Sequence, residues 1–362
     1  MRLTTTLCSL FTLLGTITAA AADGPRVVTS IKPLYGLTAA LMQGVGEPFL
    51  LIDGKNSPHG YSLRPSEARA LSGADLVVWV GPNLESFLVE PLNSLAKKAT
   101  AVTAMELDGI TVLEPREGGI WGQHRHNHGH NHGTEDGQAH EGHNHDGHNH
   151  DRHDHDGHTR DGHADEEQQE GHEEVAHSSH KDEEHHDHGR IDPHVWLDPS
   201  NAIVIAQAAA KALSDRDPAH AGVYVQNLER LIASLEALDR ALAEQLRPVE
   251  DAPYIVFHDA YHYFENRYGL SPVGTLTVSP ESTPGARRVA ELREILSNRG
   301  AVCIFSEPQF KPALIDSLAE GTDIGYGTLD PLGAEVPKGP DSYQRILTDL
   351  SASLAACLLK AG

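Results

Sequence analysis

Positively charged residues are scarce in this 362-residue sequence. Lysine and arginine together number 28 against 52 aspartates and glutamates, so the formal net charge is −24. Phosphates of nucleic acids and anionic membrane surfaces repel such an acidic chain, and neither is expected as a partner. The hydrophobic share of 39% is enough for one large domain or two ordinary ones.

Long hydrophobic runs are also missing beyond the first residues. Leu3–Ile17 is largely apolar, follows Arg2, and precedes a run of alanines that ends at Asp23. This stretch is shorter than the ~20 apolar residues that span a bilayer. A basic start, an apolar centre and a small-residue end are typical of a cleaved signal peptide rather than a membrane anchor. We therefore predict a signal peptide over 1–22 and a mature chain that is exported and soluble.

Cysteine is rare as well, with three in the chain. Removal of the signal peptide takes away Cys8 and leaves Cys303, in an expected strand, and Cys357, in an expected C-terminal helix. An even number of cysteines in an oxidising compartment favours a disulfide. Such a bridge would close about 55 residues and stabilise the fold by roughly 4 kcal/mol. The alternative is two separate buried thiols.

Histidine, in contrast, is concentrated in one segment. Residues 122–190 hold 20 of the 25 histidines, with 18 acidic residues, 5 basic residues and only four apolar ones. Such a segment cannot bury a core and is expected to be disordered without metal. Many weak metal sites are expected there, with capture or sensing of metal as their role. A solvated spacer is the alternative.

The rest of the chain alternates short apolar runs with helical spacings. Strands are expected over Arg26–Ile31, Phe49–Ile52, Leu76–Val80, Tyr254–Phe257, Val273–Val278, Ala301–Phe305 and Ile324–Leu329. Helices are expected over Pro33–Gln43, from Pro65, over Asn201–Leu213 with Ser200 as N-cap, and over Arg287–Leu296, Pro312–Leu318 and Ser342–Leu359. This alternation predicts the α/β class with parallel sheets.

One long helix is expected between the two halves. Leucines recur at spacings of three and four from Leu228 to Leu242, and Pro218 and Pro248 bound the stretch. The pattern holds for about two heptads, too few for a coiled-coil dimer, so a monomer is expected. A stiff helix of about 27 residues, near 40 Å long, should join two parallel-sheet lobes. The expected parts are an N-terminal lobe over 23–218 that includes the insert 122–190, the linking helix over 219–248, and a C-terminal lobe over 249–362.

Three histidines outside the insert and one aspartate share a setting that suits a ligand site. His59 and His194 lie in proline-containing loops, whereas His258 and Asp330 each end an apolar run. Parallel α/β sheets bind ligands at the carboxyl ends of their strands. With the 69-residue insert subtracted, the three steps between these residues are 66, 64 and 72 residues, so each half supplies two candidates. The site is therefore expected in the cleft between the lobes.

The residue types in this set predict the metal. Three imidazoles and one carboxylate suit tetrahedral zinc, whereas carboxylate-rich sets suit manganese. Taken alone, each histidine would more often be a loop or packing residue. Their shared setting, in a chain that also carries a histidine-rich insert, favours ligands.

Five motifs around these residues resemble a known family. They are SPHGYSLRPS at 57–66, DPHVWLDP at 192–199, IVFHDAY at 255–261, FSEPQF at 305–310 and GTLDPLG at 327–333. The chain is similar, over nearly all of 26–360, to the periplasmic zinc-binding proteins of ABC uptake systems (ZnuA-like, cluster A-I). This resemblance implies two α/β lobes, a rigid linking helix, Zn²⁺ in the cleft and delivery to an inner-membrane permease.

The same resemblance implies particular site residues. The family's ligand motifs fall on His59, His194 and His258, and manganese-type relatives carry Glu where this chain has His258. Some zinc members use a Glu just before the first histidine, but here that position is Pro58, so Asp330 or a water is left as the fourth ligand. The two late cysteines also match a disulfide of zinc-type members.

Other functions are weighed against this receptor. His258 and His262 are four residues apart, which is superficially similar to zinc hydrolases. However, Asp259 stands where the general-base Glu would be, and His258 ends a strand rather than lying on a helix. A periplasmic zinc buffer, with the insert as its functional part, is the other alternative. The favoured function is a zinc-binding receptor of an ABC importer, which is not an enzyme.

Overall fold

The computed structural model describes residues 24–116, 191–277, 286–298, 300–310, 318 and 323–361. The expected signal peptide, the histidine-rich segment and most of the helix expected over Pro312–Leu318 lie outside these residues. Among the helices that are described, none is long and apolar enough to cross a membrane.

Four parallel strands form the first sheet, in the order β2-β1-β3-β4. Its central strands β1 and β3 are buried throughout, as expected for apolar runs in a parallel sheet that is covered on both faces. The elements of this half are β1 (Val27–Ile31), α1 (Lys32–Leu41), β2 (Phe49–Ile52), α2 (Pro65–Ser72), β3 (Leu76–Trp79), η1 (Ser86–Leu88), α3 (Val89–Ser94), β4 (Thr100–Thr103) and η2 (Ala104–Glu106).

The second sheet repeats this topology. Its four strands are again all parallel, in the order β6-β5-β7-β8, so the first strand of each half lies between the second and the third. The elements after the insert are η5 (Val195–Leu197), α4 (Pro199–Arg216), η6 (Pro218–His220), α5 (Ala221–Leu246), η7 (Arg247–Val249), β5 (Tyr254–Val256), α6 (His262–Tyr268), β6 (Pro272–Thr275), α7 (Ala286–Asn298), β7 (Cys303–Ser306), β8 (Gly325–Thr328) and α9 (Ser342–Ala361). The α/β class predicted from the sequence is confirmed.

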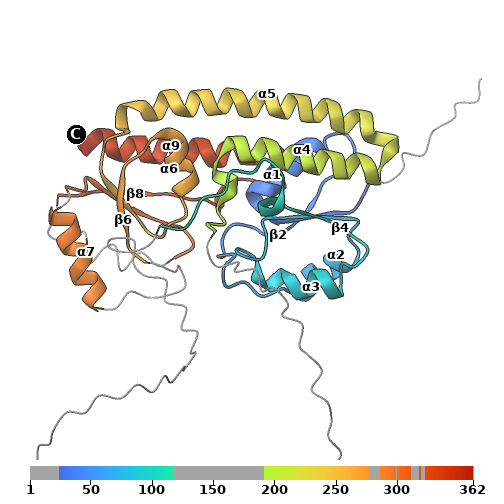
Figure 1. The fold of residues 1–362 in the computed structure, drawn as a ribbon, viewed down its shortest axis with the longest axis horizontal. Coiled ribbons are helices and arrows are strands. Elements are labelled where there is room, and N and C mark those ends of the chain that lie inside the picture. Colours follow the sequence, from blue (N-terminus) through green and yellow to red (C-terminus); the bar gives the residue numbers. More distant parts are fainter. Residues whose placement is uncertain are drawn as a thin grey trace, which may run out of the picture. The chain divides into compact units, whose positions relative to one another are not determined.

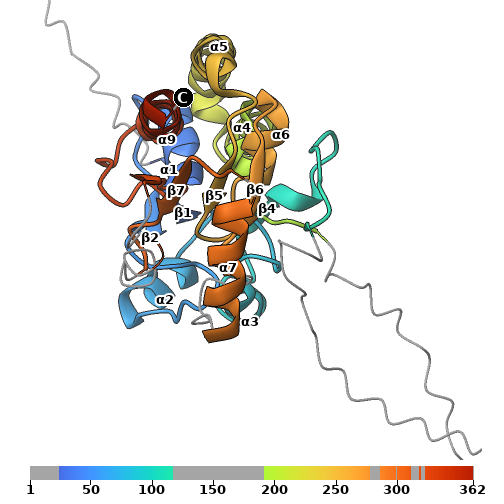
Figure 2. The same cartoon turned by 90° about the vertical axis from the view of Figure 1, so that its left-hand side faces the viewer.

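The long helix α5 packs against helices of both halves (Figures 1 and 2). It lies along α4, which covers β3 and β4, and along α9, which covers β7 and β8. Its 26 residues span about 39 Å at 1.5 Å per residue. Three of the leucines identified from the sequence are buried: Leu231, Leu235 and Leu242. The predicted long helix is therefore confirmed.

The C-terminal helix α9 also packs against α1 of the first half. Gly36 makes this close approach possible, because a Cβ there would lie 2.5 Å from Ser342 Oγ and 2.6 Å from the backbone nitrogen of Tyr343. The C-terminal end of the chain therefore packs against α1, the helix that covers the first sheet. Any larger residue at position 36 would push α1 and α9 apart.

The predicted N-cap of α4 is wrong by two residues. The helix begins at Pro199, and Asp198 caps it by accepting a hydrogen bond from the backbone nitrogen of Ser200 at 2.7 Å. Proline suits the first position of a helix because an N–H at that position would have no intrahelical partner, so its absence costs nothing. The Asp-Pro pair, rather than Ser200, was the start signal.

A disulfide joins Cys303 of β7 to Cys357 of α9, which confirms the pairing favoured by the sequence. Gly325 of the neighbouring strand β8 faces this bridge. A Cβ there would come within 2.9 Å of both sulfur atoms. The bridge therefore ties the second sheet to its covering helix where no side chain fits between them.

Glu85 provides a test of how the first sheet is stabilised. Its side chain is buried at the end of β3 and accepts hydrogen bonds from the backbone nitrogens of Val80 at 3.3 Å and Gly81 at 2.9 Å. Burial raises the pKa of Glu85 from 4.5 to about 7. The folded state therefore holds a proton that the unfolded state releases between these pH values, and stability falls as pH rises through that window.

We expect Glu85→Gln to reduce this pH dependence. Between pH 4.5 and pH 7.5 the unmodified protein should lose about 3 kcal/mol of unfolding free energy that the variant keeps. Urea unfolding across that range measures the difference. Glu90→Gln, on the exposed side of the same segment, is the control and should behave like the unmodified protein. If the Glu85 variant had the same pH dependence as the unmodified protein, the raised pKa of Glu85 would not be its cause.

Candidate metal centre

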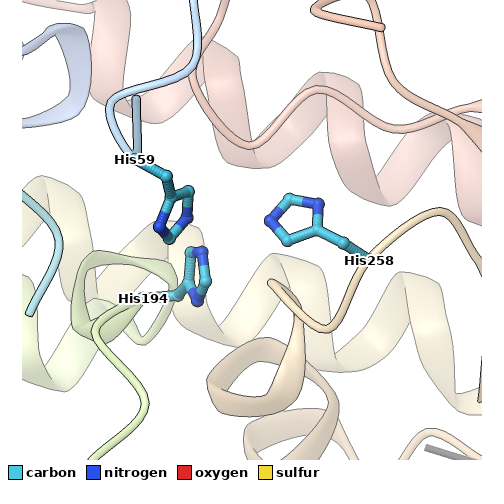
Figure 3. Close-up of side chains that lie close together, drawn as sticks. All are labelled: His59, His194 and His258. Atoms are coloured by element: carbon cyan, nitrogen blue, oxygen red, sulfur yellow. The ribbon is translucent and has the colours of Figure 1, made fainter. Parts of the chain in front are cut away.

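His59, His194 and His258 come together from three separate parts of the chain (Figure 3). His59 lies in the loop between β2 and α2, His194 directly precedes η5, and His258 follows β5. Each offers one ring nitrogen, and these three nitrogens lie within 4.8 Å of one another. Zinc–nitrogen bonds of about 2.0–2.1 Å in a tetrahedral shell put neighbouring nitrogens about 3.4 Å apart. An ion would therefore require only a small inward movement of the rings.

Two ring nitrogens of the cluster are buried without a partner. They are Nε2 of His59 and Nε2 of His258, neither of which has a hydrogen bond. Buried polar atoms in folded proteins are nearly always paired. These two unpaired ring nitrogens face the same space beside a third imidazole. Their arrangement indicates that this cluster holds a ligand.

Buried carboxylates orient two of the three imidazoles. His258 Nδ1 lies 2.6 Å from Glu307 Oε1, and His194 Nδ1 lies 2.7 Å from Asp192 Oδ1. Each histidine donates its Nδ1 proton to its carboxylate, so Nε2 keeps the lone pair that binds a metal. Carboxylate–histidine pairs of this kind are the usual support of metal-binding imidazoles.

The protonation of the cluster also follows from burial and charge. Burial first, and repulsion by the other rings second, lowers the pKa of His59 and of His194 well below its ordinary value. Burial acts in the same direction on His258, but the charge and hydrogen bond of Glu307 outweigh it and raise the pKa. Because metals bind the neutral imidazole, competition between an ion and a proton is strongest at His258.

Asp330 is not brought into the cluster. Its Oδ1 accepts hydrogen bonds from the backbone nitrogens of Leu332 at 3.1 Å and Gly333 at 2.9 Å, and Oδ2 accepts from that of Ala334. The carboxylate therefore organises the turn that follows β8. Within the described residues, the clustered donors are the three imidazoles alone, so this geometry does not support Asp330 as a ligand.

Apolar groups line part of the space beside the cluster. The ring of Trp196 lies 5.3 Å from that of His194, and Pro58, Phe310 and Leu332 also line a cavity of about 10 Å³ there. A cavity of this size admits a water-sized body, whereas organic ligands need several hundred Å³. The space beside the three histidines is thus of a size that an ion fills.

His262 does not join the cluster either. It is the first residue of α6, and its Nδ1 lies 3.7 Å from Asp192 Oδ2. The pattern that resembled a zinc hydrolase in the sequence therefore does not place two histidines on one ion. Its second histidine faces the carboxylate that supports His194.

The two supporting carboxylates were not identified from the sequence. Asp192 stands two residues before His194, and that spacing was an available signal. Glu307 is 49 residues from His258, and only the pairing of β5 with β7 brings the two together.

We expect Glu307→Ala to weaken zinc binding by about 10- to 100-fold, because the supporting partner of His258 is removed. Glu307→Gln, which still offers an oxygen to His258, should lose less. Competition with a chelating dye measures both affinities. Glu335→Gln, an exposed acid in the turn after β8, is the matched control. Native affinity in Glu307→Ala would show that this carboxylate does not support the ligand.

Comparison with known sequences identifies the family. Residues 27–357 match the ZnuA family, described as "Zinc-uptake complex component A periplasmic". The chain is 46% identical over 340 residues to the high-affinity zinc uptake system protein ZnuA of Brucella suis biovar 1, covering 94% of this chain and 93% of the relative. It is 36% identical over 343 residues to the protein of that name from Yersinia pestis, covering 92% and 91%. The chain belongs to the ZnuA family.

Solved structures show the same fold. A crystal structure of ZnuA matches 93% of this chain and 100% of its own, with a TM-score of 0.65 and 23% sequence identity. The Zn(II)-bound AdcA of Streptococcus pneumoniae matches 92% of this chain and 58% of its own, with a TM-score of 0.61 and 21% identity. The two-sheet architecture joined by a long helix is thus shared with these proteins.

Proposed function

We propose that this chain is the zinc-binding receptor of an ABC importer, which captures Zn²⁺ in the periplasm and passes it to an inner-membrane permease. The observation that carries this proposal is the convergence of three imidazole nitrogens within 4.8 Å. The relatives described above are named as high-affinity zinc uptake proteins, which supports zinc as the cargo and uptake as the process.

In the proposed site, His59, His194 and His258 bind Zn²⁺ through Nε2, and a water completes the tetrahedron. Imidazole donors suit zinc, whereas manganese prefers oxygen. Three neutral imidazoles do not compensate the double positive charge of the ion. The buried carboxylates of Asp192 and Glu307, which bind Nδ1 of His194 and His258, partly compensate it. The burial of His194 and His258 strengthens that attraction because it keeps solvent away from them.

The ligand segments suggest how the ion is released. His59 belongs to a loop of the first sheet and His258 to a strand end of the second. A relative movement of the two halves, which we propose as lobes over 23–218 and 249–362, would separate these ligands and lower the affinity. We further propose that residues 1–22 are a signal peptide and that the mature protein is a soluble monomer.

Growth under zinc limitation tests this function. Cells that lack this chain should stop growing when a chelator lowers zinc, and the unmodified gene should restore both growth and uptake of radioactive zinc. His194→Ala should restore neither. His220→Ala is the control, because His220 is outside the cluster and pairs with Asp217. Normal zinc uptake without this chain would contradict a receptor and favour a zinc buffer.

A further inference from the structure

Gln309, in the loop after β7, has an amide whose orientation is fixed. Its Nε2 donates hydrogen bonds to the carbonyl oxygen of Gly54 at 2.8 Å and to Asp330 Oδ1 at 2.9 Å. Both partners can only accept, so the nitrogen must face them. The amide oxygen therefore points away from Gly54 and Asp330.

The oxygen of this amide is buried and has no hydrogen-bond donor. Gln309 lines the same small cavity as the three clustered histidines. Trp196 Nε1 is another donor that lines this cavity, but it already donates a hydrogen bond to the carbonyl oxygen of Pro331 at 2.9 Å. A buried amide oxygen without a donor is unfavourable, and its place beside the metal cluster indicates that the missing donor comes with the bound ion.

We propose that Gln309 is a positioning residue for the fourth zinc ligand, in that a water on the ion donates a hydrogen bond to its Oε1. This inference rests on the proposed function. Three imidazoles leave one tetrahedral position, and the ion's charge makes a water bound there a strong donor. Asp330 then acts at the site indirectly, because it accepts from Nε2 and so holds the amide in place.

The same arrangement couples the fourth position to both halves of the chain. Gly54 follows β2 of the first sheet, whereas Gln309 and Asp330 follow strands of the second. The amide is held from both sides only when the two halves are in contact. Separation of the halves would release Gln309 from Gly54 and leave the water without its fixed acceptor.

Cobalt(II) in place of zinc provides the test. One equivalent of Co²⁺ is added to the full chain, and its visible spectrum is titrated with azide, which has no N–H, and with ammonia, which has N–H donors. Both ligands should replace the water in the unmodified protein, but only ammonia can donate to Oε1. In Gln309→Met the preference for azide over ammonia should rise about five- to tenfold, the worth of one hydrogen bond.

The ratio of azide affinity to ammonia affinity distinguishes a positioning role of Gln309 from a purely structural one. General loosening of the site by the substitution would change both affinities alike and leave the ratio unaltered. Gln309→Asn, which keeps an amide but shortens it by one carbon, is the second variant and should raise the ratio in the same direction. Circular dichroism checks that both variants fold.

Two results would overturn the inference alone. One is a cobalt spectrum of the unmodified protein that responds to neither ligand, since the fourth position would then hold a protein group. The other is an unchanged azide-to-ammonia ratio in both variants. If His194→Ala gave the same cobalt spectrum as the unmodified protein, the ion would lie elsewhere, and the proposed function would fail together with the inference.

Discussion

Replacing His194 by alanine should weaken zinc binding by more than about 100-fold. Loss of a supporting carboxylate typically lowers metal affinity 10- to 100-fold, and loss of a direct ligand should exceed that. The remaining two imidazoles leave an incomplete tetrahedral shell. The same result is expected for His59→Ala and His258→Ala, because each of the three nitrogens is equally needed to surround the ion.

Competition with a tight chelator at less than one equivalent of zinc measures this effect, since the tightest site fills first. His220→Ala is the matched control, because it removes an imidazole outside the cluster. It should keep the affinity within a few-fold. A variant of the cluster that bound zinc as tightly as the unmodified protein would remove that residue from the ligand set.

Removing the disulfide should have the largest effect on stability. The double substitution Cys303→Ala with Cys357→Ala should lower the free energy of unfolding by about 2–5 kcal/mol, as expected for a native bridge. The bridge joins β7 to α9 across a separation of 54 residues, so its loss frees a long loop in the unfolded chain.

Urea unfolding of the oxidised protein, of the same protein under reducing conditions, and of the double variant measures this contribution. The reduced protein and the variant should unfold at similar, lower urea concentrations. Zinc affinity should change little, because neither cysteine lines the cavity of the cluster. Equal unfolding midpoints for the oxidised protein and the variant would show that the bridge adds nothing to stability.

Elements with a strong apolar pattern were predictable from the sequence. The strands β1, β2 and β3 are short apolar runs, and the leucine spacing of α5 identified that helix within a residue or two of its bounds. Three strands or α-helices were missed. β4 is a short strand, half exposed along its length, and the helices α3 and α6 have only six and seven residues. Gly269, which ends α6 with a positive φ of 65°, was its clearest available signal.

The sequence predicted which residues lie at strand ends near the site, but not where their side chains point. The ends of β5 and β8 placed His258 and Asp330 in similar settings, yet one side chain reaches the cluster and the other binds its own turn. Spacing along the sequence does not encode side-chain direction. Glu307 and Gln309 both lie in a motif noted from the sequence, but their roles depend on contacts with His258 and Gly54 that only folding creates.

The described residues on either side of the histidine-rich segment lie close together. Asp192 donates its backbone N–H to the carbonyl oxygen of Leu113 at 2.9 Å. The hydroxyl of Tyr263 accepts from the backbone nitrogen of Leu113 at 2.9 Å and donates to the carbonyl oxygen of Asp192 at 2.7 Å. A short connection can therefore replace residues 122–190, and loop-closure entropy changes only slowly with length.

Calorimetric zinc titration of the chain without residues 122–190, together with metal analysis, tests the central claim most directly. We expect one tight site per chain with the affinity of the full-length protein, and loss of only the weak binding contributed by the insert. Failure of the folded, shortened chain to bind zinc tightly would mean that the insert supplies a ligand, and would contradict a site built from His59, His194 and His258.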